Sequence, residues 1–469
     1  MNAQRTVLPL LLALAWPGLG NASDAAPEAP KLETLEQRAS IEKDGITWTF
    51  EQPARVGRFV TGDWYVVGAA TVVKIDPAPT DERNNSALNL PADAYSAGAS
   101  PFDSRVEQGR GEKGLKLRAK LPIALKPGDA LISSISTEIR SLPSPLRESD
   151  KNISPVGSVS ILTCLKEPAP ADAFRPSYCD RGQKLYFARD LKRNLLPTLE
   201  RTPSAPKIED FAKLYARPWL DVCFFSFDAP ALYQPQYGRE LGRAAGMGAL
   251  LLCSDFKPAE KEPLLIGFIQ RGIDLWGIAR AGYGGWPAHG GHGSGRKLPL
   301  VFAGILLGDA EMAQPNKTFP NLRFGEDMQT MYDEGWTGAK AVYAGHVGKD
   351  GVPGKPDWGR YEHLPPAQWP GDLGESYRRC CTSLAWVGQA LALRLLKAQP
   401  QWDHAAFFDY VDRWMTEDDT QALEEIKKGR GRDFTADWSR QRQCWDKFVE
   451  EMWSKYRNLK PDASGKAGE

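Results

Sequence analysis

From Tyr283 to Pro299 the chain reads YGGWPAHGGHGSGRKLP, and six of these seventeen residues are glycine. Apolar segments with the spacing of helices run into this stretch (Pro263 to Arg280) and out of it (Lys297 to Gly308). A turn between two helices needs only about 2–8 residues, so a long loop that carries His, Trp, Tyr, Arg and Lys does more than connect them. Long loops on a rigid helical frame usually carry function. We therefore expect a helical domain whose active site lies in this loop.

The residues on either side of the loop predict that the C-terminal part of the chain, 205–460, is helical. Apolar residues recur there at i, i+3 and i+4, as they do on the buried face of a helix. Helix pairs joined in sequence favour a bundle or an α/α toroid. The segments with this spacing are Ile208 to Ala216, Tyr237 to Cys253, Pro263 to Arg280, Lys297 to Gly308, Gly325 to Tyr343, Ser383 to Lys397, His404 to Met415 and Ala436 to Tyr456.

The preceding part of the chain, 46–195, has the pattern of strands. Short runs rich in Val, Ile, Thr and aromatic residues alternate there with Gly, Pro, Asn and Asp, which predicts a β-sandwich. A Pro-containing linker from Leu196 to Lys207 separates the two parts. The expected strands are Ile46 to Phe50, Trp64 to Ile75, Gly114 to Leu121, Ala130 to Arg140 and Val156 to Leu165.

The N-terminus reads as an export signal, which predicts a periplasmic or secreted protein. Arg5 precedes an apolar run from Val7 to Ala15, and small residues at Gly20 and Ala22 suit a cleavage site. We expect a signal peptide at 1–22 and a disordered segment at 23–45, where Ala, Pro and Glu prevail. Cys164 and Cys179 flank a Pro-rich loop and could form a local disulfide in such a compartment.

The charge balance and the hydropathy of the chain exclude two classes of partner. Lys and Arg together number 59, as do Asp and Glu, so no overall field attracts nucleic acid. Beyond the export signal no stretch reaches the roughly 18 apolar residues that a membrane-spanning helix needs. Aromatic residues are frequent, with 15 Trp and 14 Tyr, and they serve both as sugar-stacking platforms and as core residues. We expect no membrane span and no nucleic-acid partner.

The loop holds two of the five histidines, His289 and His292. Histidine can act as a base, an acid or an anion partner near neutral pH. Packing against neighbouring backbone is the structural alternative. A second alternative is zinc held by the H-x-x-H pair with a third ligand such as His346, His363 or Glu326, although a helical scaffold for the pair is missing. We expect no cofactor, while a divalent metal stays an alternative.

Other loop residues offer groups that bind an acidic sugar. Arg296 has the planar fork that matches a carboxylate, and Lys297 adds a second positive charge. Trp286 offers a flat face and Tyr283 a phenol. The segment Gly290 to Lys297 resembles a phosphate-binding loop, but it follows a helix and Leu298 stands where Ser or Thr would bind magnesium.

Two further motifs supply candidate site residues. The first, FGEDMQTMY from Phe324 to Tyr332, offers substrate-binding polar groups and a phenol, although acidic residues at a helix start also interact with the helix dipole alone. The second, GESYRRCCTS from Gly374 to Ser383, precedes an apolar helix and offers a phenol beside two arginines that suit carboxylates. The candidates are Glu326, Asp327, Gln329 and Tyr332 in the first motif, and Tyr377, Arg378 and Arg379 in the second.

On the glycine loop and the segment Phe324 to Tyr332, the chain resembles secreted α/α-toroid polysaccharide lyases, the alginate and glucuronan lyases in particular. The resemblance covers roughly residues 205–460 and rests on short motifs. It implies an α/α-toroid fold with the site between its helices. Two features depart from the family: the β domain precedes the helices, and about eight helices are too few to close a toroid. The resemblance therefore implies an incomplete toroid that follows a β-sandwich.

Together these features predict an exported lyase that cleaves a uronate-containing polysaccharide by β-elimination. Arg296 and Arg378 are the candidates to neutralise the carboxylate, His292 or His289 to remove the C5 proton, and a tyrosine to protonate the leaving O4. The candidate tyrosines are Tyr332, Tyr283 and Tyr377. One alternative is a glycoside hydrolase with two carboxylates from Glu326, Asp327, Asp274 and Glu375. The other is a non-catalytic glycan-binding protein.

Overall fold

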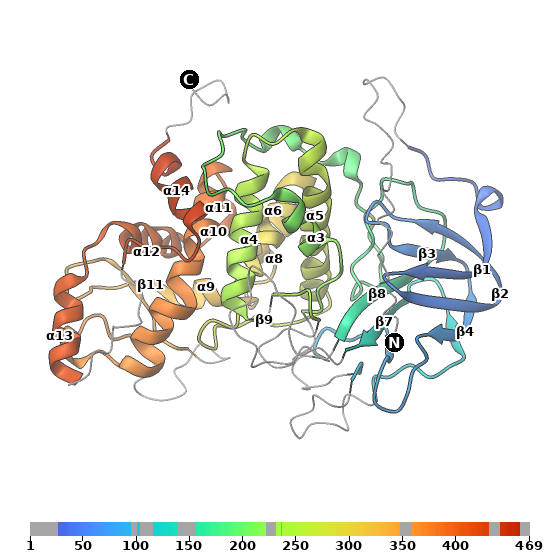
Figure 1. Cartoon of the computed structure of the whole chain (residues 1–469), viewed down its shortest axis with the longest axis horizontal. Coiled ribbons are helices and arrows are strands. Elements are labelled where there is room, and N and C mark those ends of the chain that lie inside the picture. The colour runs from blue at the N-terminus through green and yellow to red at the C-terminus, as the bar shows by residue number, and fades with distance from the viewer. Residues whose placement is uncertain are drawn as a thin grey trace, which may run out of the picture.

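A computed structural model shows a mixed α and β protein, in which a sheet packs against a larger body of helices (Figure 1). It describes residues 27–94, 101–103, 116–137, 156–221, 231–235, 237–347, 359–430 and 441–459. The expected export signal lies outside these residues. Among them, no helix is both long and apolar enough to cross a membrane.

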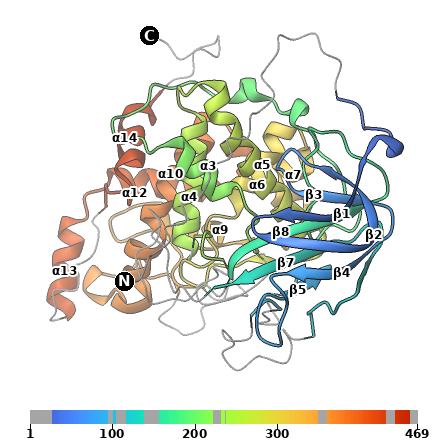
Figure 2. The same cartoon turned by 45° about the vertical axis from the view of Figure 1, so that its right-hand side comes forward.

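The described strands of the N-terminal part form one curled sheet of eight strands (Figure 2). Its order is β5-β7-β8-β3-β2-β4-β6, and β1 pairs with β2. Two facing sheets, which a sandwich requires, are not seen in the described part of the chain. The strands are β1 (Glu36–Lys43), β2 (Ile46–Arg58), β3 (Trp64–Val67), β4 (Ala70–Asp76), β5 (Ser86–Leu88), β6 (Ile123–Leu125), β7 (Ala130–Ser136) and β8 (Val156–Leu165).

Three strand predictions need correction. The segment 23–45 was expected to be disordered, but β1 lies within it, because its backbone pairs antiparallel with β2. The run Trp64 to Ile75 is two strands, because the chain turns at Gly68, whose φ is 79°. The described residues 116–121 form no named strand; Arg118 makes a single bridge to Ala87.

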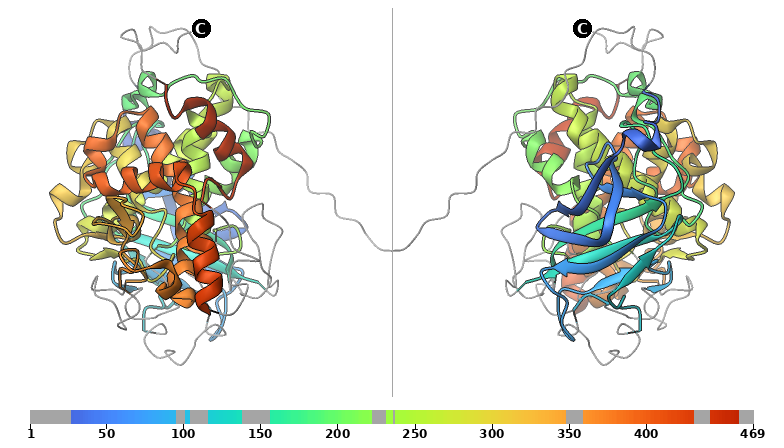
Figure 3. Two further views of the ribbon diagram at one scale, coloured as in Figure 1. Left: turned by 90° about the vertical axis from the view of Figure 1, so that its left-hand side faces the viewer. Right: turned by 90° about the vertical axis from the view of Figure 1, so that its right-hand side faces the viewer.

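The central strands β7 and β8 are buried on both faces, because nearly every residue along them is buried, including Ser133 and Ser160. One face of the sheet makes its own core with residues such as Trp48, Val66 and Leu162. The opposite face shares one core with the helices, to which the sheet contributes Ile132 and Ile161. The sheet and the helices therefore pack as one continuous structure (Figure 3).

Most helices form where apolar spacing predicts them. They are α3 (Ile208–Tyr215), α4 (Gly238–Leu252), α5 (Pro258–Arg280), α6 (Lys297–Leu307), α10 (Ser383–Leu395), α12 (Ala405–Thr416) and α14 (Lys447–Tyr456). Shorter helices are α7 (Ala310–Ala313), α8 (Pro315–Thr318), α9 (Gly325–Met328) and α11 (Gln399–Trp402), and α13 (Thr420–Arg430) was not anticipated. The predicted helix from Gly325 to Tyr343 is wrong, because only α9 is helical and the rest pairs as β11 (Thr330–Tyr332) with β12 (Ala341–Tyr343).

Close helix packing holds the two ends of the glycine loop. Helix α5 packs along α6, and α4 packs along α10. At Gly272 of α5 a Cβ atom would lie 2.4 Å from the Pro299 carbonyl oxygen, so the helices approach at a residue without a side chain. At Gly246 of α4 the nearest atoms of α10 would lie 2.9 Å from a Cβ. Larger residues at these points would force the helices apart.

Candidate functional site

The glycine loop joins α5 to α6 and lies over the start of α4. Its first part, β9 (Gly285–Trp286), pairs with β10 (Arg323–Phe324). Backbone packing is tight enough that a Cβ on Gly238 would lie 2.0 Å from the Gly291 carbonyl oxygen. Its backbone follows left-handed conformations at His289 (φ 37°) and Gly290 (φ 71°). Glycine adopts this conformation without strain at Gly290, whereas His289 adopts it although it carries a side chain.

The structure brings three of the five histidines together at this loop. His346, which follows β12, lies against Gly290, where a Cβ would be 2.9 Å from its Nε2. Both His289 and His292 are close enough to His346 to interact with its charge. His289 is exposed, His292 is half-buried and His346 is buried, so the histidines run from the surface inwards.

Two tyrosines complete what we call the His–Tyr cluster: His289, His292, His346, Tyr237 and Tyr377. The ring of Tyr377 meets His346 edge to face at 4.7 Å between centroids. The ring of Tyr237 meets His292 in the same way, also at 4.7 Å. The cluster thus contains two His–Tyr pairs on either side of the Gly290–Gly291 backbone.

The elements around the loop position these tyrosines. Tyr237 precedes the first residue of α4, and its hydroxyl accepts a hydrogen bond of 2.8 Å from the Gly291 N–H. Tyr377 lies between two π-helical turns, Gly371–Glu375 and Arg378–Thr382, that lead into α10. Such turns are rare and are frequent at functional sites.

Burial sets the protonation of the cluster. Desolvation lowers the pKa of His346, and His289 and His292 lower it further, so this imidazole is neutral at pH 7. Burial also raises the pKa of Tyr237 well above its ordinary value, so the phenol keeps its proton. A side-chain hydrogen bond with Cys380 that favours the protonated thiol, together with burial, raises the pKa of Cys381 well above its usual range. The cluster therefore includes the neutral imidazole of His346 and the protonated phenol of Tyr237, and it has no reactive thiolate at Cys381.

Arg296 does not reach the loop surface. Its side chain is buried, and its Nε donates to Asp221 Oδ1 at 3.2 Å, while its Nη1 donates to the carbonyls of both His292 and Ser294. Arg271 of α5 pairs with the same carboxylate. Both arginines keep the pKa of the buried Asp221 low. The arginine expected to bind substrate therefore holds the loop backbone instead.

Lys297 and the residues predicted in the segment Phe324 to Tyr332 also pair with other protein groups instead of facing solvent, with the exception of Tyr332. Lys297 is fully buried and pairs with Asp327, with its ammonium over the Trp402 ring at 4.5 Å. Glu326 is buried and accepts the Gly295 N–H at 2.7 Å. Gln329 is buried and donates to Tyr343 at 2.8 Å. Lys297, Glu326 and Gln329 are therefore buried beneath the glycine loop, and they do not line an open surface.

The aromatic candidates outside the cluster lie apart from it. Trp286 is buried, and its Nε1 donates to the Asp221 carbonyl at 3.4 Å, so its face is no platform for sugar. Tyr283 is buried against it, with ring centroids 5.4 Å apart. Tyr332 is 54% exposed and donates to Asp409 at 2.6 Å, on the β11–α12 side.

The two arginines of the second motif lie in a buried ion-pair network. Arg378 and Arg379 both pair with Glu375, and Arg379 also pairs with Asp419. Because Arg379 and Arg378 lie beside it, the pKa of Glu375 falls to about 2. This network anchors the π-helical turns that present Tyr377, and it leaves neither arginine on the surface.

The described residues contain neither the expected disulfide nor a set of metal ligands. Cys164 and Cys179 are free thiols, so the local disulfide is wrong. Across the described ranges, no group of three or more His, Cys, Asp or Glu side chains is placed to hold a metal ion.

Sequence reasoning missed Tyr237 and gave His346 only as a third zinc ligand. Tyr237 carries no motif; its one signal is its place directly before the predicted helix over Tyr237 to Cys253. His346 lies in a segment that the sequence did not connect to the loop. Comparison of the chain with protein-family models, curated proteins and solved structures found no match.

Proposed function

We propose that the protein is an exported polysaccharide lyase that cleaves a uronate-containing chain by β-elimination at the His–Tyr cluster. The observation that carries the proposal is the convergence of three histidines and two tyrosines at the glycine loop, with His289 exposed. β-Elimination needs a base at C5 and an acid at O4, and neutral imidazole and phenol suit these roles near pH 7.

The roles follow from exposure and contact. His292 is half-buried and is held by the Tyr237 ring, so we assign it as the base. Tyr377 is half-buried and is held by His346, so we assign it as the acid. His289 at the surface then faces the uronate carboxylate, a role that the buried Arg296 and Arg378 do not fill.

The helical frame supports the incomplete-toroid part of the proposal. Helices α4, α5 and α6 pack as neighbours in chain order, and α10 packs on α4. The hydrolase alternative has less support, because its carboxylates are occupied. Asp274 pairs with Arg175 and Glu375 with two arginines, while Glu326 is buried beneath the loop.

The test is ultraviolet absorbance of the new C4=C5 double bond while purified protein is incubated with alginate, glucuronan, pectate and glycosaminoglycans. We expect a rise on one substrate that falls roughly 100-fold or more in His292→Ala and Tyr377→Phe, the usual share of acid–base catalysis.

Two variants serve as matched controls. His363 is an exposed histidine outside the cluster, and Tyr332 is the exposed tyrosine paired with Asp409. His363→Ala and Tyr332→Phe are expected to keep full activity. New reducing ends without absorbance would replace the proposal by hydrolysis, and saturable binding without turnover would replace it by a glycan-binding protein.

A further inference from the structure

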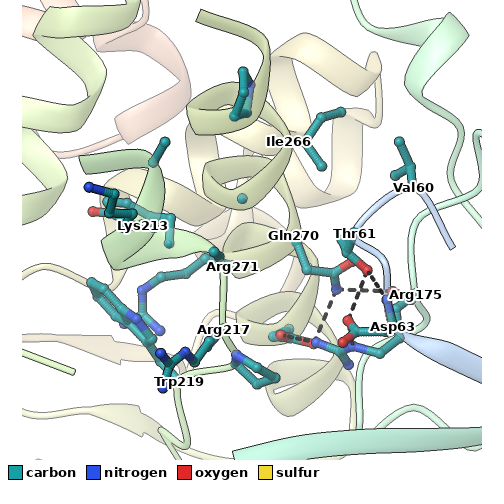
Figure 4. A pocket seen from close by; sticks show the side chains of 17 residues that line it. Val60, Thr61, Asp63, Arg175, Lys213, Arg217, Trp219, Ile266, Gln270 and Arg271 are labelled. Carbon is teal, nitrogen blue, oxygen red and sulfur yellow. Dashed lines mark hydrogen bonds and ion pairs between the residues drawn. The ribbon is translucent and has the colours of Figure 1, made fainter. Parts of the chain in front are cut away.

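A cavity of ≈ 290 Å³ lies between the sheet and the helices, separate from the His–Tyr cluster (Figure 4). The turn between β2 and β3 (residues 60–63) forms one side, and the end of α3 with the middle of α5 forms the other. Small-ligand pockets begin at about this volume. Its mouth is at the surface, where Lys213 and Pro263 are exposed.

Two residues that line the cavity each carry a buried polar atom without a hydrogen-bond partner among the described residues. Gln270 is 6% exposed; its Nε2 donates to the Arg175 carbonyl at 3.0 Å, while its Oε1 accepts nothing. Arg271 is 5% exposed; its terminal nitrogens hold Asp221, while its Nε donates to nothing. An unpaired buried group costs about 1–3 kcal/mol. A ligand that reached these two atoms would satisfy one acceptor and one donor.

The charge of the lining favours an anion. Among the described residues the cavity is lined by four cations and two carboxylates, and both carboxylates already pair with one of these cations, Arg175. Lys213 and Arg217 stand at the mouth, and Arg271 lies deeper, packed on Trp219 at 4.1 Å. The remaining wall is apolar and includes Ile266.

We propose that this cavity binds a small hydroxy-carboxylate of the size of one sugar acid. Its carboxylate would face Arg217 and Arg271 Nε, a hydroxyl would donate to Gln270 Oε1, and its C–H face would lie on Ile266. Asp221 links this site to the loop, because it accepts from both Arg271 and Arg296. The inference stands on the cavity alone and does not require lyase activity.

The test is isothermal titration calorimetry of the full chain with D-glucuronate, compared with glucose, which lacks the carboxylate, and hexanoate, which lacks the hydroxyls. We expect one saturable site for glucuronate and weaker binding of the other two. Ile266→Trp, which fills the cavity without changing a polar group, is expected to abolish binding. The double change Lys213→Gln with Arg217→Gln at the exposed mouth should weaken it roughly tenfold or more.

Two controls separate this site from others. Lys340→Gln removes an exposed lysine that does not line the cavity, and binding is expected to be unchanged. His292→Ala alters the His–Tyr cluster, and binding is again expected to persist. Absent glucuronate binding, equal binding of glucose, or full binding in Ile266→Trp would overturn the proposal, and loss in His292→Ala would move the site to the loop.

Discussion

Gly290→Ala is the most direct perturbation of the His–Tyr cluster, because it adds one methyl group at its centre. The new Cβ would lie 2.2 Å from Cε1 of Tyr377 and 2.9 Å from Nε2 of His346. Neither separation is compatible with van der Waals contact, so the two rings must move. The φ of 71° adds a backbone penalty, since left-handed conformations cost a non-glycine residue about 1–2 kcal/mol.

Gly282→Ala provides a matched control at the start of the same loop. Its φ is 91°, and a Cβ there would meet no atom within 4 Å. The backbone penalty of about 1–2 kcal/mol is therefore shared, and the overpacking cost of about 1–3 kcal/mol applies to Gly290 alone. We expect a loss in the free energy of unfolding of about 1–2 kcal/mol for Gly282→Ala and about 2–5 kcal/mol for Gly290→Ala.

Both variants are to be measured by urea unfolding, followed by tryptophan fluorescence, and by the ultraviolet lyase assay. Gly290→Ala is expected to lose activity at temperatures where it is still folded, because its methyl group displaces Tyr377. Gly282→Ala is expected to keep it. The reasoning would be refuted if the two variants lost equal stability and both remained active, since the cluster would then tolerate displacement.

Three further outcomes follow from the buried groups. Glu375→Gln removes the carboxylate that Arg378 and Arg379 share, while Glu362 and Asp419 still pair with them, so urea unfolding should show a loss of about 1–3 kcal/mol; unchanged stability would argue against a tight network. Asp274 has a folded pKa of about 6, above its ordinary 3.8, so the native state holds its proton more tightly and stability falls as pH rises from 4 to 6. Asp274→Asn should flatten that fall, and an unchanged profile would contradict the assignment. Tyr237→Phe leaves the Gly291 N–H without its acceptor, which should lower the free energy of unfolding by about 1–3 kcal/mol. An unchanged melting temperature would contradict this hydrogen bond.

The helices could be predicted well from the sequence because their apolar stripes repeat at a helical period. Segments such as Pro263 to Arg280 matched a helix to within a few residues. The segment Gly325 to Tyr343 failed, because its spacing resembles a helix while its backbone pairs as a hairpin. Strand pairing depends on residues far along the chain, so spacing could not distinguish a sandwich from one curled sheet.

The candidate site was also predicted only in part from the sequence. The glycine loop and its histidines were found from composition, since so many glycines and histidines rarely gather in a plain connection. The sequence did not show which charged residues reach the surface of the glycine loop. Arg296, Lys297 and Arg378 look like ligand-binding cations in the sequence, yet each is buried beside a carboxylate.

Local order along the chain specifies the helices, the loop and the kinds of chemical group that it carries, because these depend on residues near one another. The convergence of His346, Tyr237 and Tyr377 on the loop depends on how β12, α4 and the π-helical turns pack. The burial of Arg296, Arg378 and Arg379 in ion pairs also depends on this packing, because a buried charge needs a partner and only the fold brings that partner close. These long-range contacts, which sequence spacing does not encode, select which of the candidate residues can meet a substrate.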